Sequence, residues 1–340
     1  MHPAQSRSLP QRALLIVGAL LLAAVASLLV AGMTGSIAIA PGELPAALVQ
    51  VLHGRTDSMA ATLLELRAGR ALTAFVTGGA LALAGVMMQA LLRNPLADPY
   101  ILGISAGASV GALLALLLMC AAATVDAAAL AGAVGVAMLL YLFARRDMRS
   151  GAALEGGTSM LLTGVILSSS CMALVTLMLS IAPEGRLRSM VFWMIGDLAG
   201  APVRALPWIV LGGALLYALR SARAMNVVAL HADNAGTLGI RVGALRKGLF
   251  FVSGLLTASA VTSAGSIGFI GLIIPHACRF AFGPDHRVLI PAAVLGGGSF
   301  LVLCDTLART VVAPTQLPVG AITALIGAPV FLYQLHQLRK

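Results

Sequence analysis

Three arginines at the ends of apolar segments are the residues best suited to recognise an acidic partner. Arg67 and Arg70 stand three residues apart where one apolar segment begins, and Arg309 stands where another ends. A guanidinium group can bind a carboxylate through two parallel hydrogen bonds, which makes the contact strong and directional. These side chains could therefore dock an acidic protein, or they could extend to lipid phosphates. Asp305, four residues before Arg309, could instead orient Arg309.

Motifs for nucleotide binding or metalloprotease chemistry are missing from the sequence. It has no GxxxxGK[ST] or HExxH pattern, and its only lysines are Lys247 and Lys340. Its four cysteines are widely scattered in the sequence, and we expect them to pack as small apolar side chains. We therefore predict no catalytic site, no metal and no cofactor, and we expect any ATP-driven step to use a separate ATPase chain.

The composition is that of a membrane protein. The chain has 340 residues, of which 59% are hydrophobic and 10% charged, with a mean hydropathy of +0.99. Soluble domains carry about 25% charged residues. Because a backbone in hydrocarbon must satisfy its own hydrogen bonds, the sequence predicts an all-α integral membrane protein, with 1–340 forming a single polytopic transmembrane domain. The ten predicted spans are 12–33, 68–90, 100–119, 127–144, 160–181, 205–219, 246–264, 268–281, 288–307 and 318–338.

The basic residues predict the orientation of these spans. With both termini in the cytoplasm, 15 of the 22 Lys and Arg residues fall on the cytoplasmic side. Contact of these residues with membrane lipid explains the net charge of +10. The sequence has no basic face with interleaved aromatic residues, so nothing indicates that it binds nucleic acid. A cleaved signal peptide ending near "AIA" (38–40) is the alternative for the first span. The seven basic residues on the outer side are Arg55, Arg67, Arg70, Arg186, Arg188, Arg204 and Arg309.

A polar turn, "RNPLADPYILG" (93–103), interrupts the apolar sequence on the cytoplasmic side. Asn94 before Pro95 ends the preceding helix, and Asp98 before Pro99 is a helix-start signal, so the turn should be tight and rigid. Small residues in "TGGALALAG" (77–85) and "GISAGASVGA" (103–112) predict close helix packing, with the lining of a translocation path as the alternative. The longest cytoplasmic loop is predicted at 221–246, either a functional loop or a solvated basic one.

Several long motifs give the chain a close resemblance to the permease subunits of type II ABC importers for iron-siderophores, haem and cobalamin. They follow one another in the order typical of that family. The motifs are "MQALLRNPLADPYILGISAGASVGA" (88–112), "GRLRSMVFWMIGDLAGA" (185–201), "ALHADNAGTLGI" (229–240), "GSIGFIGLIIPHACRF" (265–280), "GPDHRVLIP" (283–291) and "DTLARTVVAPTQLPVGAITALIGAPVFL" (305–332).

The resemblance implies an assembly and assigns residues to it. It implies a homodimer with a substrate path on its two-fold axis, two cytoplasmic ABC ATPase subunits and a periplasmic substrate-binding protein. Asn94, Leu96, Thr158 and Ser159 match cytoplasmic gate positions, and Arg67, Arg70 and Arg309 match the arginines that dock the binding protein. "RAGR" (67–70) has Ala-Gly where the family usually has Leu-Pro, so its helix start should be less stiff. The residues that match the ATPase-coupling segment are His231, Ala232, Asp233, Asn234, Ala235, Gly236, Leu238 and Gly239.

The function implied is transport across the cytoplasmic (inner) membrane rather than catalysis. The leading prediction is an ATP-driven importer of an iron chelate, either a ferric siderophore or haem, and cobalamin is the alternative. An ion-coupled secondary transporter is a third class. It is disfavoured because the twelve acidic residues lie in predicted loops or at span ends rather than in mid-membrane.

Overall fold

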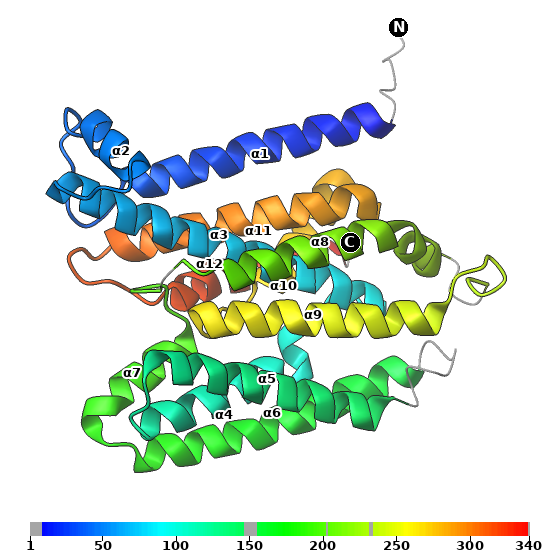
Figure 1. Ribbon diagram of the computed structural model, residues 1–340. Helices are drawn as coiled ribbons and strands as arrows, with labels where there is room; N and C mark the ends of the chain where they lie inside the picture. The colour runs from blue at the N-terminus through cyan, green and yellow to red at the C-terminus, as the bar shows by residue number, and fades with distance from the viewer. Residues whose placement is uncertain (1–8, 146–154, 202, 231–233, 339–340) are drawn as a thin grey trace, which may run out of the picture.

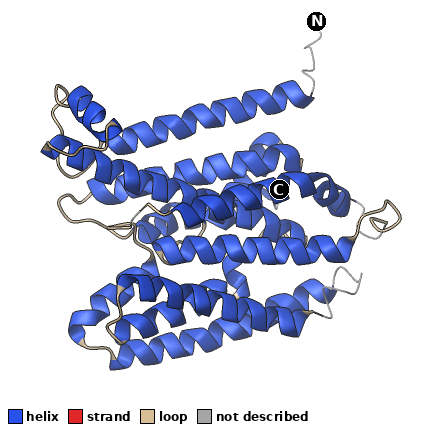
Figure 2. Cartoon of the chain, viewed as in Figure 1, coloured by secondary structure: helices blue, strands red, loops and turns tan. Residues whose placement is uncertain are grey.

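The structure, a computed structural model, describes residues 9–145, 155–201, 203–230 and 234–338. Within these ranges the chain forms twelve α-helices and one short 3-10 helix, and no strand (Figure 2). The elements are α1 (Leu9–Met33), α2 (Leu44–Leu52), α3 (Met59–Leu92), η1 (Pro99–Leu102), α4 (Ile104–Leu117), α5 (Ala122–Ala144), α6 (Glu155–Ile181), α7 (Glu184–Ile195), α8 (Ala205–Leu230), α9 (Val242–Ala264), α10 (Ile270–Phe282), α11 (His286–Thr310) and α12 (Val319–Leu338).

The length and apolarity of these helices make the chain an integral membrane protein. Seven helices (α1, α3, α5, α6, α8, α9 and α11) are long and apolar enough to cross a membrane, and α4, α10 and α12 are shorter apolar helices. Each of the ten predicted spans overlaps one of these helices. The sequence missed α2 and α7 because both are short, and α7 opens with Glu184 and two arginines.

The core is built around α3. In its most apolar stretch 89% of residues are buried, against 11% for α1, so α3 is central and α1 peripheral. Figure 1 shows α1 on one side of the bundle, with α3 and α11 next to it and α4, α5 and α6 grouped on the other side. The helix bundle has two ends in Figure 1. We call the end with α2 and α7 the α2–α7 end, and the opposite end, which carries the connection between α8 and α9, the 231–241 end.

Small residues permit the close crossings inside this bundle. A Cβ on Gly85 of α3 would lie 1.9 Å from the carbonyl oxygen of Gly271 in α10. A Cβ on Gly111 of α4 would lie equally near the carbonyl oxygen of Ala128 in α5. No side chain fits at such distances, so the predicted close packing of 77–85 and 103–112 is confirmed.

The turn at 93–103 has the stiffness that its sequence predicts. Arg93 ends α3 in the left-handed conformation (φ 50°), and the Asn94 side-chain oxygen accepts a hydrogen bond from the Leu96 N–H at 2.9 Å. Asp98 caps η1 by accepting from the Tyr100 N–H at 2.7 Å. The sequence predicted a span from residue 100 onwards; the structure instead places η1 there and starts α4 after Gly103, whose φ is 80°.

The connection between α8 and α9 is shorter than the predicted loop 221–246. Helix α8 continues to Leu230 and α9 begins at Val242, which leaves only 231–241 between them. Residues 221–230 contain one arginine, Arg223, and no proline or glycine, so nothing in them ends a helix. The prediction mistook surface charge for a loop.

Candidate functional site

The three predicted docking arginines lie together at the α2–α7 end, around one carboxylate. Arg70 of α3 donates from Nε to both oxygens of Asp305 in α11, at 2.9 and 3.0 Å. Arg309, one turn further along α11, donates from Nε to Asp305 Oδ2 at 3.1 Å. Asp305 is 1% exposed, so it joins α3 to α11 through a buried ion-pair network. The predicted orientation of Arg309 by Asp305 is confirmed.

The same cluster holds the end of α1. Arg67 donates to the carbonyl oxygens of Met33 (3.3 Å) and Ile37, and Arg309 donates to the carbonyl oxygens of Ala31 (3.2 Å) and Thr34 (3.4 Å). The last carbonyls of a helix have no partner within the helix, so arginines that reach them both satisfy and anchor that end.

Burial of these arginines changes the expectation that came from their place in the sequence. Arg67 and Arg309 are 6% and 5% exposed, and the Arg70 side chain is 10% exposed. They therefore have internal partners rather than free guanidinium groups at the surface. Their docking role stays a prediction, and any acidic partner would have to displace Asp305 or the carbonyls of α1.

The predicted gate residues lie on two segments that η1 connects. Asn94 and Leu96 belong to the turn before η1, and η1 packs against α6, where a Cβ on Gly164 would lie 2.7 Å from the Ile101 carbonyl oxygen. Ser159 is exposed in the first turns of α6, and its carbonyl oxygen accepts from Thr163. The backbone of Thr158 is helical, but its side chain lies outside the described residues. The role of these residues in gating stays a prediction.

A pocket of about 390 Å³ is lined by hydroxyl groups and thioethers. The Ser105 and Ser266 hydroxyls are hydrogen-bonded at 2.9 Å, and the Tyr100 hydroxyl accepts from the Ile267 N–H at 3.1 Å. All of its nine lining residues are uncharged, so the pocket offers donors and acceptors to a neutral polar group. The lining residues are Tyr100, Ser105, Ala106, Ser109, Ser168, Ser169, Met172, Met194 and Ser266.

A larger and charged pocket, of about 520 Å³, adjoins it at the α2–α7 end. It contains the ion pair between Arg204 and Asp126, and Arg188 lies over the ring of Phe192 at 5.4 Å. Trp193 and Gly265 line this pocket, whereas their chain neighbours Met194 and Ser266 line the hydroxyl pocket. The wall between the two is backbone, because a Cβ on Gly265 would lie 2.2 Å from the Trp193 carbonyl oxygen.

Sequence reasoning missed both pockets because their residues come from segments far apart in the chain. The hydroxyl pocket draws on η1, α4, α6, α7 and the α9–α10 connection. A local signal was the pair Ser105 and Ser109, spaced one helical turn apart in "GISAGASVGA".

The predicted coupling segment lies at the 231–241 end as a compact turn. The Asn234 carbonyl oxygen accepts from the N–H groups of Thr237 and Leu238, and Ala235 is fully buried. Asn234, Gly236, Leu238 and Gly239 are exposed, with Leu238 at 60%. The turn therefore presents an exposed apolar tip on a fixed base. His231, Ala232 and Asp233, also assigned to coupling, lie outside the described residues.

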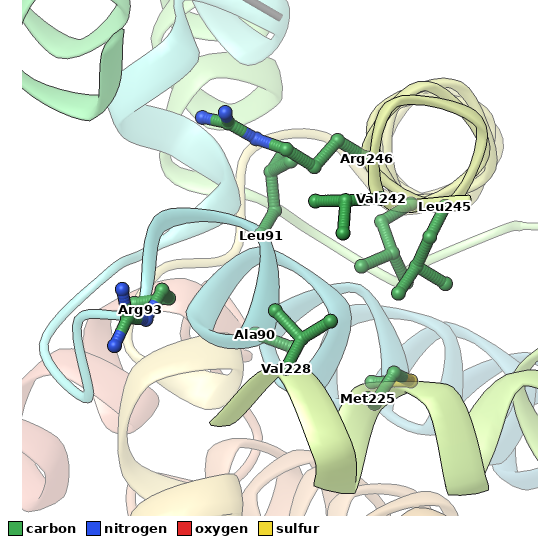
Figure 3. A pocket seen from close by; sticks show the side chains of 9 residues that line it. Ala90, Leu91, Arg93, Met225, Val228, Val242, Leu245 and Arg246 are labelled. Atoms are coloured by element: carbon green, nitrogen blue, oxygen red, sulfur yellow. The ribbon is translucent and has the colours of Figure 1, made fainter. Parts of the chain in front are cut away.

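Below this turn, side chains of α3, α8 and α9 converge on a small cavity (Figure 3). Leu91, Val242 and Leu245 face Met225 and Val228 across it. Its volume of about 30 Å³ is room for one water molecule, so it is too small for a ligand.

The comparisons with known proteins agree on one family. The model of the FecCD transport family matches residues 16–337. The cobalamin import system permease protein BtuC of Halobacterium salinarum is 42% identical over 276 residues, which cover 80% of this chain and 72% of that protein. The vitamin B12 import system permease protein BtuC of Escherichia coli is 38% identical over 281 residues, covering 81% and 84%. A solved structure described as an ABC transporter of the metal-chelate type, in an inward-facing conformation, superposes with a TM-score of 0.79 at 30% identity and covers 95% of this chain and 99% of that one.

Proposed function

We propose that this chain, which belongs to the FecCD transport family and is the permease subunit of a type II ABC importer, carries cobalamin across the cytoplasmic membrane. The observation that carries the choice of substrate is its 42% identity with a cobalamin permease over 80% of the chain. This reverses the order that we drew from the motifs, which put an iron chelate first and cobalamin second. The motifs identify the family, but few of their residues report on the substrate.

The hydroxyl pocket supports this choice on chemical grounds. The edge of cobalamin carries neutral carboxamides, which both donate and accept hydrogen bonds, as serine and tyrosine hydroxyls do. Haem carries propionates, and many ferric siderophores are anionic. Such ligands would call for arginine or lysine, whereas the lining of this pocket is uncharged.

An iron chelate is the second candidate. The observation in its favour is the similarity to the metal-chelate transporter, which extends over nearly the whole chain at 30% identity.

The proposed topology is ten crossings with both termini in the cytoplasm. The seven long apolar helices and the three shorter ones together support this number. The ends of α3, α8, α9 and α10 carry Arg93, Arg223, Arg246 and Arg279 at the 231–241 end, which supports placing that end in the cytoplasm. The α2–α7 end then faces the periplasm.

We place the partner proteins on these two ends. Two copies of the chain form a homodimer, and an ABC ATPase binds each copy through the exposed tip at 234–239. The binding protein meets the α2–α7 end, where its carboxylates would have to compete with Asp305 for Arg70 and Arg309. The turn at 93–103 and the start of α6 form the gate, and η1 transmits movement between them because it packs on α6.

The test is whole-cell uptake in a strain that lacks this chain, with and without a plasmid copy. Labelled cobalamin, haem and a ferric siderophore are supplied separately. We expect the plasmid copy to restore cobalamin uptake alone. Restoration of haem or siderophore uptake without cobalamin would promote the second candidate, and restoration of none would overturn the proposal. A Leu238→Asp variant should lose uptake through lost ATPase coupling, whereas Leu230→Ser, at a position on α8 that is more exposed (77% against 60%), should keep it.

A further inference from the structure

A basic cavity at the 231–241 end lies beside the proposed gate turn, but its charged lining has no role in the transport function proposed above. It has a volume of about 250 Å³ and lies where the ends of α3, α8 and α10 meet the start of α11. Arg93, Arg279 and Gln89 line it, together with His286 and the prolines Pro95 and Pro284. This volume is several times the roughly 30 Å³ of one water molecule. It suits a compact group rather than a whole cobalamin.

No acidic side chain lines this cavity to balance its positive charge. Arg93 and Arg279 line it and no carboxylate does. Neither arginine takes part in the ion pairs found within the described ranges. The nearby Asp285 makes no ion pair with either arginine in these ranges, and its Oδ1 accepts from the Asn226 amide at 2.7 Å and from the Arg287 N–H at 3.0 Å.

Arg279 is held in place but only partly satisfied. Its Nη2 donates to Gln89 Oε1 at 2.9 Å, and Gln89 is 3% exposed. Its Nη1 is buried and has no hydrogen-bond partner among the residues that the structure describes. A buried donor without a partner is costly, so it calls for an acceptor that the chain itself does not provide.

On the proposed topology, on which this inference rests, the surroundings of the cavity suit the edge of the membrane. Phe280, next to Arg279 in the last turn of α10, is 84% exposed, and Leu230, next to the lining residue Ala229, is 77% exposed. Apolar side chains of this exposure suit lipid tails. Basic pockets between membrane helices at the cytoplasmic surface bind anionic lipid headgroups.

We propose that this cavity, lined by Arg93 and Arg279, binds a phosphate group, and that the phosphate belongs to an anionic phospholipid at the cytoplasmic surface. Arg279 donates to the phosphate oxygens after its side chain turns to bring the buried, unpaired Nη1 into the cavity, and Arg93 adds a second positive charge from the rim. The exposed apolar side chains beside the cavity contact the lipid tails. The site is independent of which substrate the permease carries.

The experiment measures lipid binding to the full chain by native mass spectrometry. The protein is exchanged from detergent into equal amounts of phosphatidylglycerol and phosphatidylcholine, with or without inorganic phosphate. Arg279→Gln should lower phosphatidylglycerol binding roughly tenfold, the size of one charge-assisted hydrogen bond. Arg93→Asn should lower phosphatidylglycerol binding about threefold, and asparagine tolerates the left-handed conformation of residue 93. This second variant still tests the site if Arg279→Gln fails to fold. Arg220→Gln, an exposed arginine of α8 outside the cavity, is the control and should bind as the unchanged protein does.

Each outcome decides a separate part of the proposal. Preference for phosphatidylglycerol that depends on both arginines supports it. Binding of inorganic phosphate that depends on Arg279, with no lipid preference, keeps the phosphate chemistry and overturns the lipid as its source. Equal binding of both lipids by all variants overturns the site. If Arg279→Gln leaves lipid binding intact but releases the ATPase, the occupant is a carboxylate of that subunit and the proposal is wrong.

Discussion

The two ends of the molecule use arginine in opposite ways. At the α2–α7 end, Arg67 and Arg309 are buried, Arg70 is half-buried, and all three bind partners within the chain: Asp305, Gln316 and the carbonyls of α1. At the 231–241 end, Arg93 is exposed and the buried Nη1 of Arg279 has no partner in the described chain. Arginines with partners inside the chain stabilise the fold, whereas arginines without them can bind something else. The difference depends on the neighbours of each arginine and not on its position in the sequence.

The largest effect should follow from removing the shared carboxylate. Asp305→Asn leaves Arg70 and Arg309 buried without a counter-charge, which should cost about 3 kcal/mol of stability. Asp126→Asn is the control, because its pair with Arg204 is partly exposed and should cost less than about 1 kcal/mol. Thermal unfolding of both variants in the same detergent measures the difference. Equal losses would show that the α2–α7 cluster is no more structural than a surface pair.

A smaller effect should follow from releasing the end of α1. Arg67→Met keeps an apolar stem of similar length but leaves the carbonyl oxygens of Met33 and Ile37 without their donor. We expect a loss of roughly 1–2 kcal/mol and faster hydrogen exchange in residues 31–37, with α11 unaffected. Unchanged exchange in 31–37 would mean that packing alone holds α1.

The turn at 234–239, predicted to couple to the ATPase, should respond more weakly than the arginine cluster at the α2–α7 end. Gly239 has φ 80°, and a Cβ there would meet no other atom within 4 Å. Gly239→Ala should therefore cost about 1 kcal/mol through backbone strain alone. Gly236→Ala, equally open but without a positive φ, is the matched control and should be close to neutral. If thermal unfolding shows equal stability for Gly239→Ala and Gly236→Ala, the result would contradict the described turn.

The smallest effect on stability should come from Arg93. Since it is exposed and has no ion pair among the described residues, Arg93→Asn should change the unfolding free energy by less than about 0.5 kcal/mol. Comparison with Arg67→Met sharpens the contrast between the two ends. A loss at Arg93 as large as that at Arg67 would remove the distinction between structural and ligand-binding arginines.

Hydrophobicity and local turn chemistry were enough to predict the main elements. The ten apolar segments all correspond to helices, and the pairs Asn94-Pro95 and Asp98-Pro99 specify the turn between α3 and α4 because those effects act within a few residues. Helix α7 was missed because its twelve residues are neither long nor uniformly apolar. The end of α8 was placed too early because arginines at a helix end look like a loop in sequence.

Long-range contacts could not be predicted from the sequence. Arg70 and Asp305 are separated by 235 positions, and only the packing of α3 on α11 brings them together. The sequence could not show that the predicted docking arginines have partners inside the chain, because span ends alone do not reveal which carbonyls and carboxylates lie nearby; their docking role stays a prediction. The hydroxyl pocket likewise needs five segments to meet.

The most direct test of the proposed function is transport by proteoliposomes that contain this chain with its ATPase and binding protein. Initial rates of ATP-dependent uptake are measured for labelled cobalamin and for a labelled ferric siderophore, each at saturating concentration. We predict ATP-dependent accumulation of cobalamin and no accumulation of the siderophore above vesicles without ATP. Accumulation of the siderophore without cobalamin would contradict the account and make this chain an iron-chelate permease.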